Sequence, residues 1–390
     1  MSSQPPSNSL SCDLAIVGGG LAGGLIALAV LNKHPHARIL LLERERTVGG
    51  NHVWSFFDGD VPDADRWLID PMIAHRWPGG YDVRFPKYRR TLSTPYNSIT
   101  SGKFDAHLRA VLGDRIVQGA AAHLSPDSVT LEDGREIATA SVIDARGGGD
   151  LSVLKCGWQK FVGQSLRLSA PHGLTRPVVM DTTVEQIDGY RFVYLLPTGE
   201  TEIFVEDTYY SDGPDLPAEA IRARIADYAT AQGWTVEAVT HEETGVLPVV
   251  HEGDFDALWP ERDPVARAGV RGGIFHPLTG YSLPDAVAFA LHVADRWPLD
   301  GTSLAAESRR WAKAHWAGAG YYRMLGSLLF FAAKPGLQYK VFQRFYGLSP
   351  ALIQRFYAGR STLYDKGRIL CGRPPVPISS AIKTLLNRGS

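Results

Sequence analysis

The stretch that decides the fold is DLAIVGGGLAGGLIALAVLN, residues 13–32. A short apolar strand is expected over 13–17, three glycines follow it, and the apolar run after them predicts a helix that ends before Pro35. A second apolar strand over 39–42 ends at Glu43, which completes a βαβ unit. Glycines at such a junction permit a tight turn, and the helix N-terminus offers unpaired N–H groups to a phosphate.

Three glycines of this segment and the acid after the second strand have the spacing of a dinucleotide-binding motif. Gly18, Gly20 and Gly23 form the pattern GxGxxG, and Glu43 follows at the end of the second strand, where its carboxylate can bond ribose hydroxyls. The sequence therefore predicts a dinucleotide site, with a merely structural turn as the alternative. A second glycine-rich turn at 49–51 suits a longer ligand lying across the first domain, which favours FAD over NAD.

Two later segments predict further contacts with the same ligand. Residues 115–144 predict short strands and a hairpin, and a strand-to-glycine junction follows at Gly147, with a plain turn as the alternative. The segment 268–283, AGVRGGIFHPLTGYSL, leads into a predicted helix whose N-terminus suits an electron-rich flavin ring. Ser282 is the expected N-cap, and Asp285 is expected to complete a capping box. The predicted cofactor-binding residues are Gly18, Gly20, Gly23, Glu43, Gly50, Asn51, Ala121, Asp144, Gly147, Pro277, Gly280 and Tyr281.

A β-rich segment with two adjacent carboxylates separates these nucleotide-binding pieces. Its central part, RFVYLLPTGETEIFVEDTY over 191–209, predicts two strands hinged at 197–200 and ends in Glu206 and Asp207. Adjacent residues of a strand point to opposite faces, so only one of the two acids can face a substrate. By alternation Asp207 lies on the more apolar face of the strand, which favours Asp207 as the acid that faces a substrate. The longer side chain of Glu206 favours Glu206 instead. A solvated strand end is the alternative interpretation of the pair.

Three other features receive structural interpretations. The basic, aromatic stretch at 81–96 is expected to be a solvated surface strand. His276 is expected to be a packed loop histidine, and the helix predicted over 216–232 is expected to serve as scaffold.

Composition limits the function classes. The chain has 390 residues, of which 44% are hydrophobic, and a net charge of −1, which argues against a generally basic nucleic-acid binder. Its three cysteines lie far apart in the sequence, so neither a disulfide framework nor a CxxC metal site is indicated, and a reducing cytoplasm fits. The first ten residues do not have the pattern of a signal peptide, and no window is apolar enough to predict a transmembrane helix.

The fold class expected from these segments is α/β. It combines a Rossmann-like FAD-binding domain, an inserted β-rich substrate domain and a helical C-terminal region. The expected division is a disordered tail over 1–11, an FAD-binding domain over 12–160 and 260–300, a substrate domain over 161–259 and a helical region over 301–390.

The C-terminal region carries a basic, aromatic signal. Between Lys334 and Arg373 there are eight Lys or Arg and one acid, interleaved with seven aromatic residues. A helical region of this composition suits an interfacial surface that attracts anionic lipid, with a solvated helical surface as the alternative.

The order of the motifs resembles that of a known superfamily. The dinucleotide opening, the DARG turn and the HPLTGYS element resemble the glutathione-reductase-like FAD flavoproteins, which include aromatic hydroxylases and geranylgeranyl reductases. Several stretches look more specifically like the bacterial lycopene β-cyclases, and FVEDT is similar to the Phe-Leu-Glu-Glu-Thr signature of plant cyclases. These stretches are GNHVWSF at 50–56, YRFVYLLP at 190–197, FVEDT at 204–208, GVLPV at 245–249 and GGIFHPLTGYSLP at 272–284.

The chain departs from these relatives at two places. Flavoproteins of this superfamily usually have Gly-Asp at the start of the closing element, where the Asp binds the ribityl chain, whereas Gly269 and Val270 stand there in this chain. That departure argues against a standard oxidase or hydroxylase site. Where bacterial cyclases often continue WSF with His, this chain has Phe57, so no role of that histidine carries over.

The resemblance implies an acid-catalysed, non-redox cyclisation of the ψ-ends of lycopene to β-ionone rings, giving γ-carotene and β-carotene. Glu206 is taken as the acid, with Asp207 as the alternative, because protonating an alkene needs a carboxyl that keeps its proton in a dry cavity. Reduced FAD would stabilise the carbocation, and NADH or NADPH would serve only to reduce the flavin. The alternatives are a redox flavoenzyme acting on a lipid, such as a hydroxylase or prenyl reductase, and a non-enzymatic carotenoid-binding flavoprotein.

The resemblance also implies the partners and the location. Lycopene or a related acyclic carotenoid and a membrane surface are expected, without nucleic acid or metal. Because a C40 hydrocarbon must be collected from membrane, the protein is expected in the cytoplasm, peripherally associated with the inner face of the membrane.

Overall fold

The computed structural model describes residues 10–372 and 376–386. A disordered tail was expected over 1–11, and its first nine positions lie outside the described residues. Its last two positions are ordered instead, because the first strand begins at Leu10, which pairs with Ile137 of a parallel strand.

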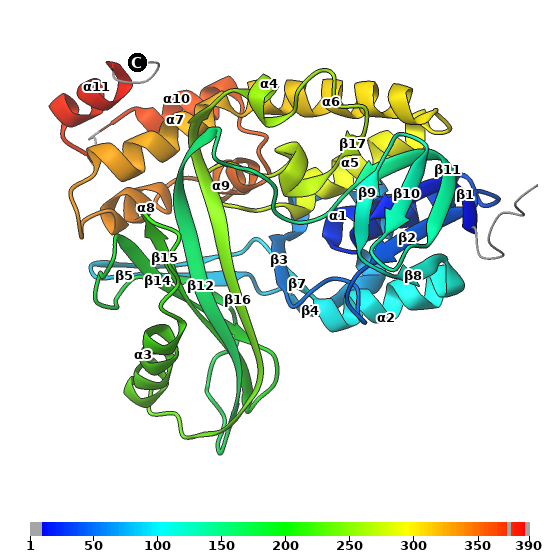
Figure 1. The fold of residues 1–390 in the computed structure, drawn as a ribbon. Coiled ribbons are helices and arrows are strands. Elements are labelled where there is room, and N and C mark those ends of the chain that lie inside the picture. Colours follow the sequence, from blue (N-terminus) through cyan, green and yellow to red (C-terminus); the bar gives the residue numbers. More distant parts are fainter. Residues whose placement is uncertain (1–9, 373–375, 387–390) are drawn as a thin grey trace, which may run out of the picture.

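The Rossmann-like part is an α/β arrangement around a mostly parallel sheet (Figure 1). Its strand order is β8–β2–β1–β11–β10–β9, with β17 paired to β11 beside this path. Helices α1 and α5 pack against each other and share one apolar core with the sheet, so the predicted Rossmann-like opening is confirmed. The strands are β1 (Leu10–Val17), β2 (Ile39–Glu43), β8 (Ile116–Gln118), β9 (Ala121–Leu124), β10 (Ser128–Leu131), β11 (Glu136–Asp144) and β17 (Ala266–Arg267), and the helices are α1 (Leu21–Lys33), α2 (Ser101–Leu112), α4 (Phe255–Leu258), α5 (Leu283–Arg296) and α6 (Gly301–Gly318).

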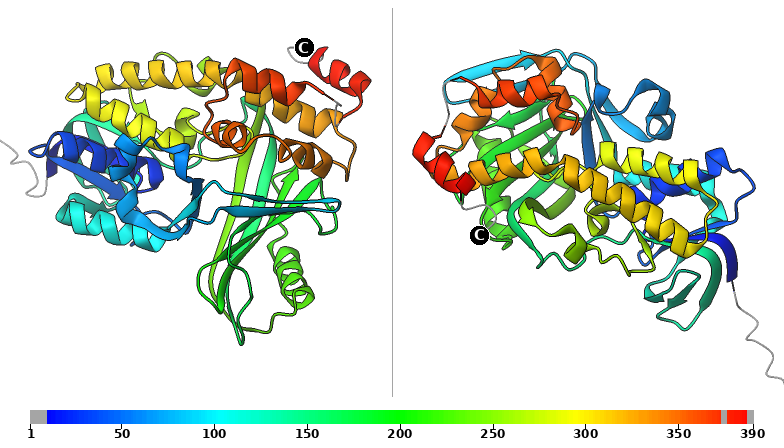
Figure 2. Two further views of the ribbon diagram at one scale, coloured as in Figure 1. Left: turned by 180° about the vertical axis from the view of Figure 1, so that it is seen from behind. Right: turned by 90° about the horizontal axis from the view of Figure 1, so that it is seen from above.

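A second seven-stranded sheet extends away from this part and forms the β-rich region (Figure 1). Its order is β16–β12–β15–β14–β13–β5–β6. Helix α3 covers one face through Ile221, Ile225 and Tyr228, and the C-terminal helices cover part of the other face (Figure 2). The elements are β5 (Tyr81–Phe85), β6 (Tyr88–Leu92), β12 (Leu154–Leu168), β13 (Val178–Asp181), β14 (Tyr190–Pro197), β15 (Glu202–Ser211), α3 (Ala218–Ala231) and β16 (Val236–Gly253).

Strands β5 and β6 come from the stretch that the sequence suggested to be a solvated surface strand, and that interpretation is wrong. Tyr81, Val83 and Phe85 are almost completely buried. The reason is non-local, because β5 pairs in parallel with β13 and its apolar side chains pack into the core shared with the C-terminal helices. The large sheet therefore takes β5, β6 and the start of β12 from outside the expected 161–259 segment.

A three-stranded sheet, β3–β7–β4, lies between the two larger sheets (Figure 1). Three short turns of 3-10 helix separate β3 from β4, and the last of them packs against α2. The elements are β3 (Val53–Phe57), η1 (Asp58–Asp60), η2 (Asp63–Leu68), η3 (Asp70–Met72), β4 (Ile73–Trp77) and β7 (Tyr96–Thr100), and two further 3-10 turns are η4 (Gly113–Arg115) and η5 (Gly269–Gly272).

The C-terminal region is helical, as predicted, and packs on the large sheet. The ring of Phe342 stacks on Tyr190 with centroids 4.4 Å apart, and Tyr346 and Tyr357 are buried. Several aromatic residues of the basic stretch therefore belong to the core. No helix within 10–372 and 376–386 has the length and apolar character that crossing a bilayer requires. The elements are α7 (Gly320–Ser327), the π-helical turn η6 (Leu328–Ala332), α8 (Tyr339–Phe345), α9 (Pro350–Tyr357), α10 (Leu363–Leu370) and α11 (Ile378–Leu386).

Candidate active site

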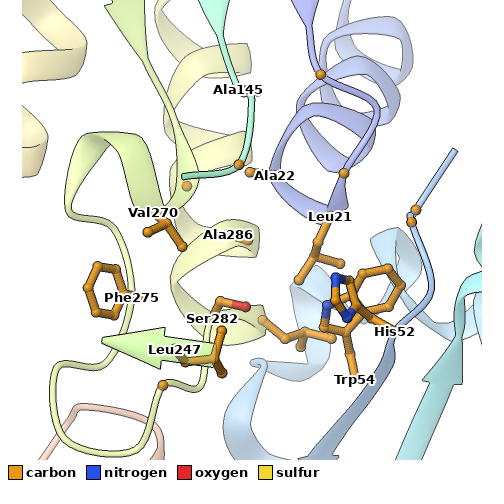
Figure 3. Close-up of a pocket in the computed structure, with 18 of the residues that line it drawn as sticks. Leu21, Ala22, His52, Trp54, Ala145, Leu247, Val270, Phe275, Ser282 and Ala286 are labelled. Carbon is orange, nitrogen blue, oxygen red and sulfur yellow. The ribbon is translucent and has the colours of Figure 1, made fainter. Parts of the chain in front are cut away.

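A cavity of about 810 Å³ lies where the Rossmann-like part meets the large sheet. Its lining includes the glycine-rich loop between β1 and α1, the N-terminus of α5, and strands β12, β14, β15 and β16. Figure 3 shows Val270 and Phe275 on one side of this space and His52 and Trp54 on the other. Residues of the glycine-rich loop and residues of the large sheet therefore share one cavity.

The glycine-rich loop has the packing that a phosphate-binding turn needs. Gly18 has a φ of +110°, and a Cβ there would lie 2.7 Å from backbone atoms of Ala145. A Cβ at Gly23 would lie 2.0 Å from the carbonyl oxygen of Gly18, so this glycine lets α1 pack against the loop. A Cβ at Gly20 would meet nothing within 4 Å, and the N-terminus of α1 has no side-chain cap. Its N–H groups are therefore open to an anion.

The Glu43 carboxylate lies directly beside this loop. One of its oxygens accepts a hydrogen bond from the Gly19 N–H at 2.8 Å, and the other accepts from the Glu45 N–H at 3.0 Å. These bonds hold the acid at the C-terminal end of β2, the position from which such an acid binds ribose.

Most of the predicted cofactor residues line the cavity. They come from five separate segments, which the fold brings together. The predicted residues in the lining are Gly18, Gly20, Glu43, Gly50, Ala121, Gly147, Gly280 and Tyr281.

The other four predicted cofactor residues lie outside this lining and have partners within the protein. Gly23 packs against the glycine loop, and the Asn51 side chain donates a hydrogen bond to the Glu242 carbonyl. The Asp144 carboxylate pairs with Arg146 at 2.8 Å. The Pro277 carbonyl accepts from the Val250 N–H at 2.9 Å.

The capping box expected at the start of α5 does not form. Ser282 occupies the N-cap position, but its side chain makes no capping hydrogen bond and lies in the cavity wall (Figure 3). Asp285 pairs instead with the His315 ring at 3.2 Å. His315 belongs to α6, so local sequence did not reveal this competing partner.

The two adjacent acids of β15 lie on opposite faces of the sheet. Glu206 lines the cavity, and its Oε1 accepts a hydrogen bond from the Thr208 hydroxyl at 2.6 Å. Asp207 is completely buried on the other face, where Arg191 donates to its two oxygens at 2.8 and 2.9 Å. The Tyr209 hydroxyl also donates to Asp207, at 2.8 Å. Asp207 is thus held in an ion pair and has no place in the cavity lining.

A second carboxyl group, which the sequence analysis missed, lies beside Glu206. Glu243 of β16 lines the same cavity and shares a side-chain hydrogen bond with Glu206. The Val53 N–H donates to its Oε2 at 2.8 Å. Burial raises the pKa of Glu206 to about 7. Burial and the neighbouring charge of Glu206 raise the pKa of Glu243 to about 9.

Comparison with known proteins identifies the family. Residues 13–383 match the family described as lycopene cyclase protein. The lycopene beta-cyclase of Pseudescherichia vulneris is 45% identical, over 96% of this chain and 97% of its own length. The lycopene beta-cyclase of Pantoea ananas is 44% identical, over 96% and 98%. The chain belongs to the lycopene cyclase family.

More distant similarities agree with the fold. The flavin-dependent brominase Bmp2 has a TM-score of 0.61 at 14% identity, covering 90% of this chain and 94% of its own. A geranylgeranyl bacteriochlorophyll reductase-like protein from Thermoplasma acidophilum has a TM-score of 0.60 at 13% identity, covering 97% and 99%. These two likenesses show that this lycopene cyclase family member shares its fold with flavin enzymes and reductase-like proteins.

One sequence signal in this cyclase-family chain could have led to Glu243. Glu243 precedes the GVLPV stretch on the same strand. By alternation it shares one face of the strand with Gly245 and Leu247. Glu243 and Leu247 both line the cavity. The missing information was the strand pairing that brings this face next to Glu206.

Aromatic residues of the large sheet divide between cavity and core. Tyr194 and Phe204 line the cavity, whereas Tyr190 and Phe192 are buried under the C-terminal helices. His276 is a packed loop histidine, as expected, because its Nδ1 accepts from the Thr279 N–H at 3.2 Å. Burial lowers the pKa of its imidazole to about 4.

The two departures from the family pattern have clear positions. Val270 lies in the cavity wall (Figure 3), so the place of the usual ribityl-binding Asp is apolar. Phe57 is buried among the rings of Tyr81, Tyr96 and Tyr357 and serves packing. Among the described residues, no three His, Cys, Asp or Glu side chains gather where they could hold a metal ion.

Proposed function

We propose that this chain cyclises the acyclic ψ-ends of lycopene to β-ionone rings, giving γ-carotene and β-carotene, by acid catalysis without net redox. The observation that carries the proposal is Glu206, a half-buried carboxyl with a raised pKa in the same cavity as the nucleotide loop. The family supports the substrate, because relatives 40–45% identical are named lycopene beta-cyclases.

Glu206 acts as the acid. Protonating a terminal alkene requires a carboxyl that still carries its proton near neutral pH, far above the usual glutamate pKa of about 4.3. With a pKa of about 7, the Glu206 carboxyl meets this requirement. The proton moves to the terminal double bond, the neighbouring alkene closes the ring by forming a carbon–carbon bond, and the ring then loses a proton to the carboxylate.

The apolar lining supports this chemistry. Phe161, Phe204 and Leu247 line the cavity beside Glu206, so they exclude water that would otherwise capture the cation. The aromatic faces of Tyr194 and Phe204 add a cation–π stabilisation of about 0.5–2 kcal/mol each.

The glycine loop, Glu43 and the N-terminus of α5 fit FAD. The space beside Gly20 accepts the pyrophosphate, and Glu43 is fixed where a ribose binds. When bound and reduced by NADH or NADPH, FAD supplies a negative charge that stabilises the carbocation. Val270 offers the ribityl chain an apolar contact in place of a carboxylate.

We also propose peripheral contact with the inner, cytoplasmic face of a membrane through one end of the molecule. The apolar side chains exposed there define the C-terminal apolar surface: Phe331, Leu337, Leu363, Tyr364, Leu370, Ile378, Ile382, Leu385 and Leu386. They belong to η6, α10, α11 and the turn before α8, which cluster at one end of the fold (Figures 1 and 2). Exposed Lys334, Arg368 and Lys383 in the same segments attract anionic headgroups.

The test is cyclisation by the purified protein. Lycopene is supplied in liposomes under anaerobic conditions, with and without dithionite-reduced FAD. We expect β-carotene to form only with reduced flavin, without stoichiometric loss of NADH or NADPH. Hydroxylated or reduced lipid products with stoichiometric loss would favour a redox flavoenzyme instead, and carotenoid binding without any product would favour a non-enzymatic carotenoid-binding flavoprotein.

A further inference from the structure

Glu206 and Glu243 occupy one row across three adjacent strands. Gly163 of β12 pairs with Glu206 of β15 on one side and with Glu243 of β16 on the other. Directly opposed residues of antiparallel strands project from the same face. The two carboxyl groups therefore meet over a residue that has no side chain.

Gly163 makes this meeting possible. A Cβ at this position would lie 2.3 Å from the Phe204 ring and 3.3 Å from the Cγ of Glu243. Strands in a sheet lie about 4.8 Å apart, so the backbones of the two glutamates are separated by roughly 10 Å. Two glutamate side chains span this gap, whereas an aspartate at either position is too short by a methylene.

The hydrogen bond between the two carboxyl groups requires a proton on at least one of them, since ionised carboxylates only accept. The Thr208 hydroxyl donates to Oε1 of Glu206, and the Val53 N–H donates to Oε2 of Glu243. One oxygen of each group is thereby occupied as an acceptor. This leaves one oxygen of each group for the bond between the two side chains.

The surroundings disfavour two charges at this place. Two buried carboxylates repel each other, so one of them holds its proton more tightly. The Nδ1 of His52 lies 3.9 Å from Oε2 of Glu243, and Asp207, on the opposite face, is already paired with Arg191. The titratable groups around the pair are His52, Tyr96, Tyr194, Asp207 and Tyr281.

We propose that Glu243 is a positioning residue that stays protonated during cyclisation and donates its hydrogen bond to the Glu206 carboxylate. This role rests on the proposed function. The O–H bond of Glu206 breaks as its proton forms a C–H bond with the alkene, and a carbon–carbon bond closes the ring. The ring C–H proton then returns to Glu206, so atoms and electrons balance without a co-reactant. Throughout, the Glu243 proton stays in place and stabilises the carboxylate that Glu206 becomes.

Two variants of Glu243 separate hydrogen bonding from packing. Glu243→Gln keeps a neutral donor, so we expect kcat within a few-fold of the native value. Glu243→Leu keeps the bulk but removes the donor, so we expect kcat to fall about 10- to 100-fold with KM little changed. The alkaline limb of its pH profile should move to higher pH, because the bond from Glu243 lowers the pKa of Glu206. Equal losses in both variants, or an unmoved pH limb in Glu243→Leu, would overturn the proposal.

The matched control is Glu242→Gln. Glu242 is the preceding residue of β16, and its carboxylate pairs with Arg222 at 2.7 Å on the other face of the strand. The pH profile of the Glu242→Gln variant should be that of the native protein. A shift as large as that of Glu243→Leu would show that the effect is not specific to the pair and would count against the proposal.

An infrared measurement tests the protonation of Glu243 without turnover. At pH 8, below the pKa of about 9 for Glu243, the native-minus-Glu243→Gln difference spectrum should contain the band of a protonated carboxylic acid. The difference removes the contribution of Asp60, whose pKa burial raises to about 8. Absence of the band would overturn the proposal even if the native protein cyclises lycopene. A native protein that shows the band but forms no ring would instead contradict the proposed function.

Discussion

Glu206 and Asp207 are neighbours in the chain, yet the pleat of β15 gives them different chemistry. Asp207 faces a guanidinium that donates to both of its oxygens, which favours the charged form. Glu206 faces a cavity instead, where removal from water favours the protonated form more strongly than the hydrogen bonds from Thr208 and Glu243 oppose it. Strand alternation predicts that only one of them faces the cavity. Their partners, which come from β14 and β16, determine which one.

At this scale, Glu206→Gln tests the acid. The amide keeps the shape of the side chain but has no transferable proton, so kcat should fall about 10²- to 10⁴-fold while bound flavin is retained. Cyclisation in liposomes and flavin absorbance measure the two effects. Glu202→Gln, an exposed change on the same strand, should behave like the native protein. Full activity in Glu206→Gln would assign the acid role to another residue.

Asp207→Asn should affect stability more than catalysis. The change leaves Arg191 buried without its ionic partner, which costs about 3–5 kcal/mol of unfolding free energy. Denaturant titration measures this loss, and the cyclisation rate per folded molecule should stay near the native value. A folded Asp207→Asn protein without activity would make Asp207 part of the catalytic machinery.

The buried carboxyl pair should also make stability depend on pH. In the folded protein the pKa values of Glu206 and Glu243 are about 7 and 9, above the ordinary glutamate value of 4.5. The folded state therefore binds more protons between these limits, and the free energy of unfolding decreases as the pH rises from about 4.5 towards 9. Denaturant titrations should show a smaller decrease in the Glu206→Gln/Glu243→Gln double variant. An equal decrease in both proteins would contradict the raised pKa values.

At the scale of elements, β12 holds the site together because both acidic strands pair with it. Gly163→Ala should place a methyl group against the Phe204 ring and Glu243, costing about 1–3 kcal/mol of unfolding free energy and at least tenfold in kcat. Gly102→Ala is the control, because a Cβ there would meet nothing within 4 Å. Thermal melts and cyclisation rates compare the two variants. Native activity in Gly163→Ala would mean that a side chain is tolerated between Glu206 and Glu243.

The same scale shows what the sequence could predict. The βαβ opening is local, because its glycines, its helix and Glu43 lie within one short segment, and it was predicted correctly. Glu243 was missed because its partner is reached through Gly163 of a third strand. The burial of β5 likewise depends on its pairing with β13, and the Asp285 side chain, which was expected to complete a capping box, pairs with His315 of α6. Non-local pairing accounts for each of these differences.

At the scale of the whole molecule, two separate sheets of the fold enclose one cavity. The Rossmann-like sheet contributes the loop beside Gly20, and the large sheet contributes Glu206 and Glu243. The C-terminal helices pack on that same large sheet and also carry the C-terminal apolar surface. The surface proposed to contact the membrane is thus built on the elements that pack against the strands of Glu206 and Glu243.

Membrane contact should therefore depend on this surface. Native protein is expected to float with vesicles that contain anionic lipid, and less so at high salt, because screening weakens the attraction of its Lys and Arg side chains. Ile382→Asp combined with Leu386→Asp removes two apolar contacts, each contributing about 1.5–3 kcal/mol when fully buried, so the bound fraction should fall at least tenfold. Val111→Asp, an equally drastic change at an exposed position of α2, should leave flotation unchanged. If the Ile382→Asp/Leu386→Asp protein floats as well as the native protein, membrane contact uses another face, and substrate entry must be sought there.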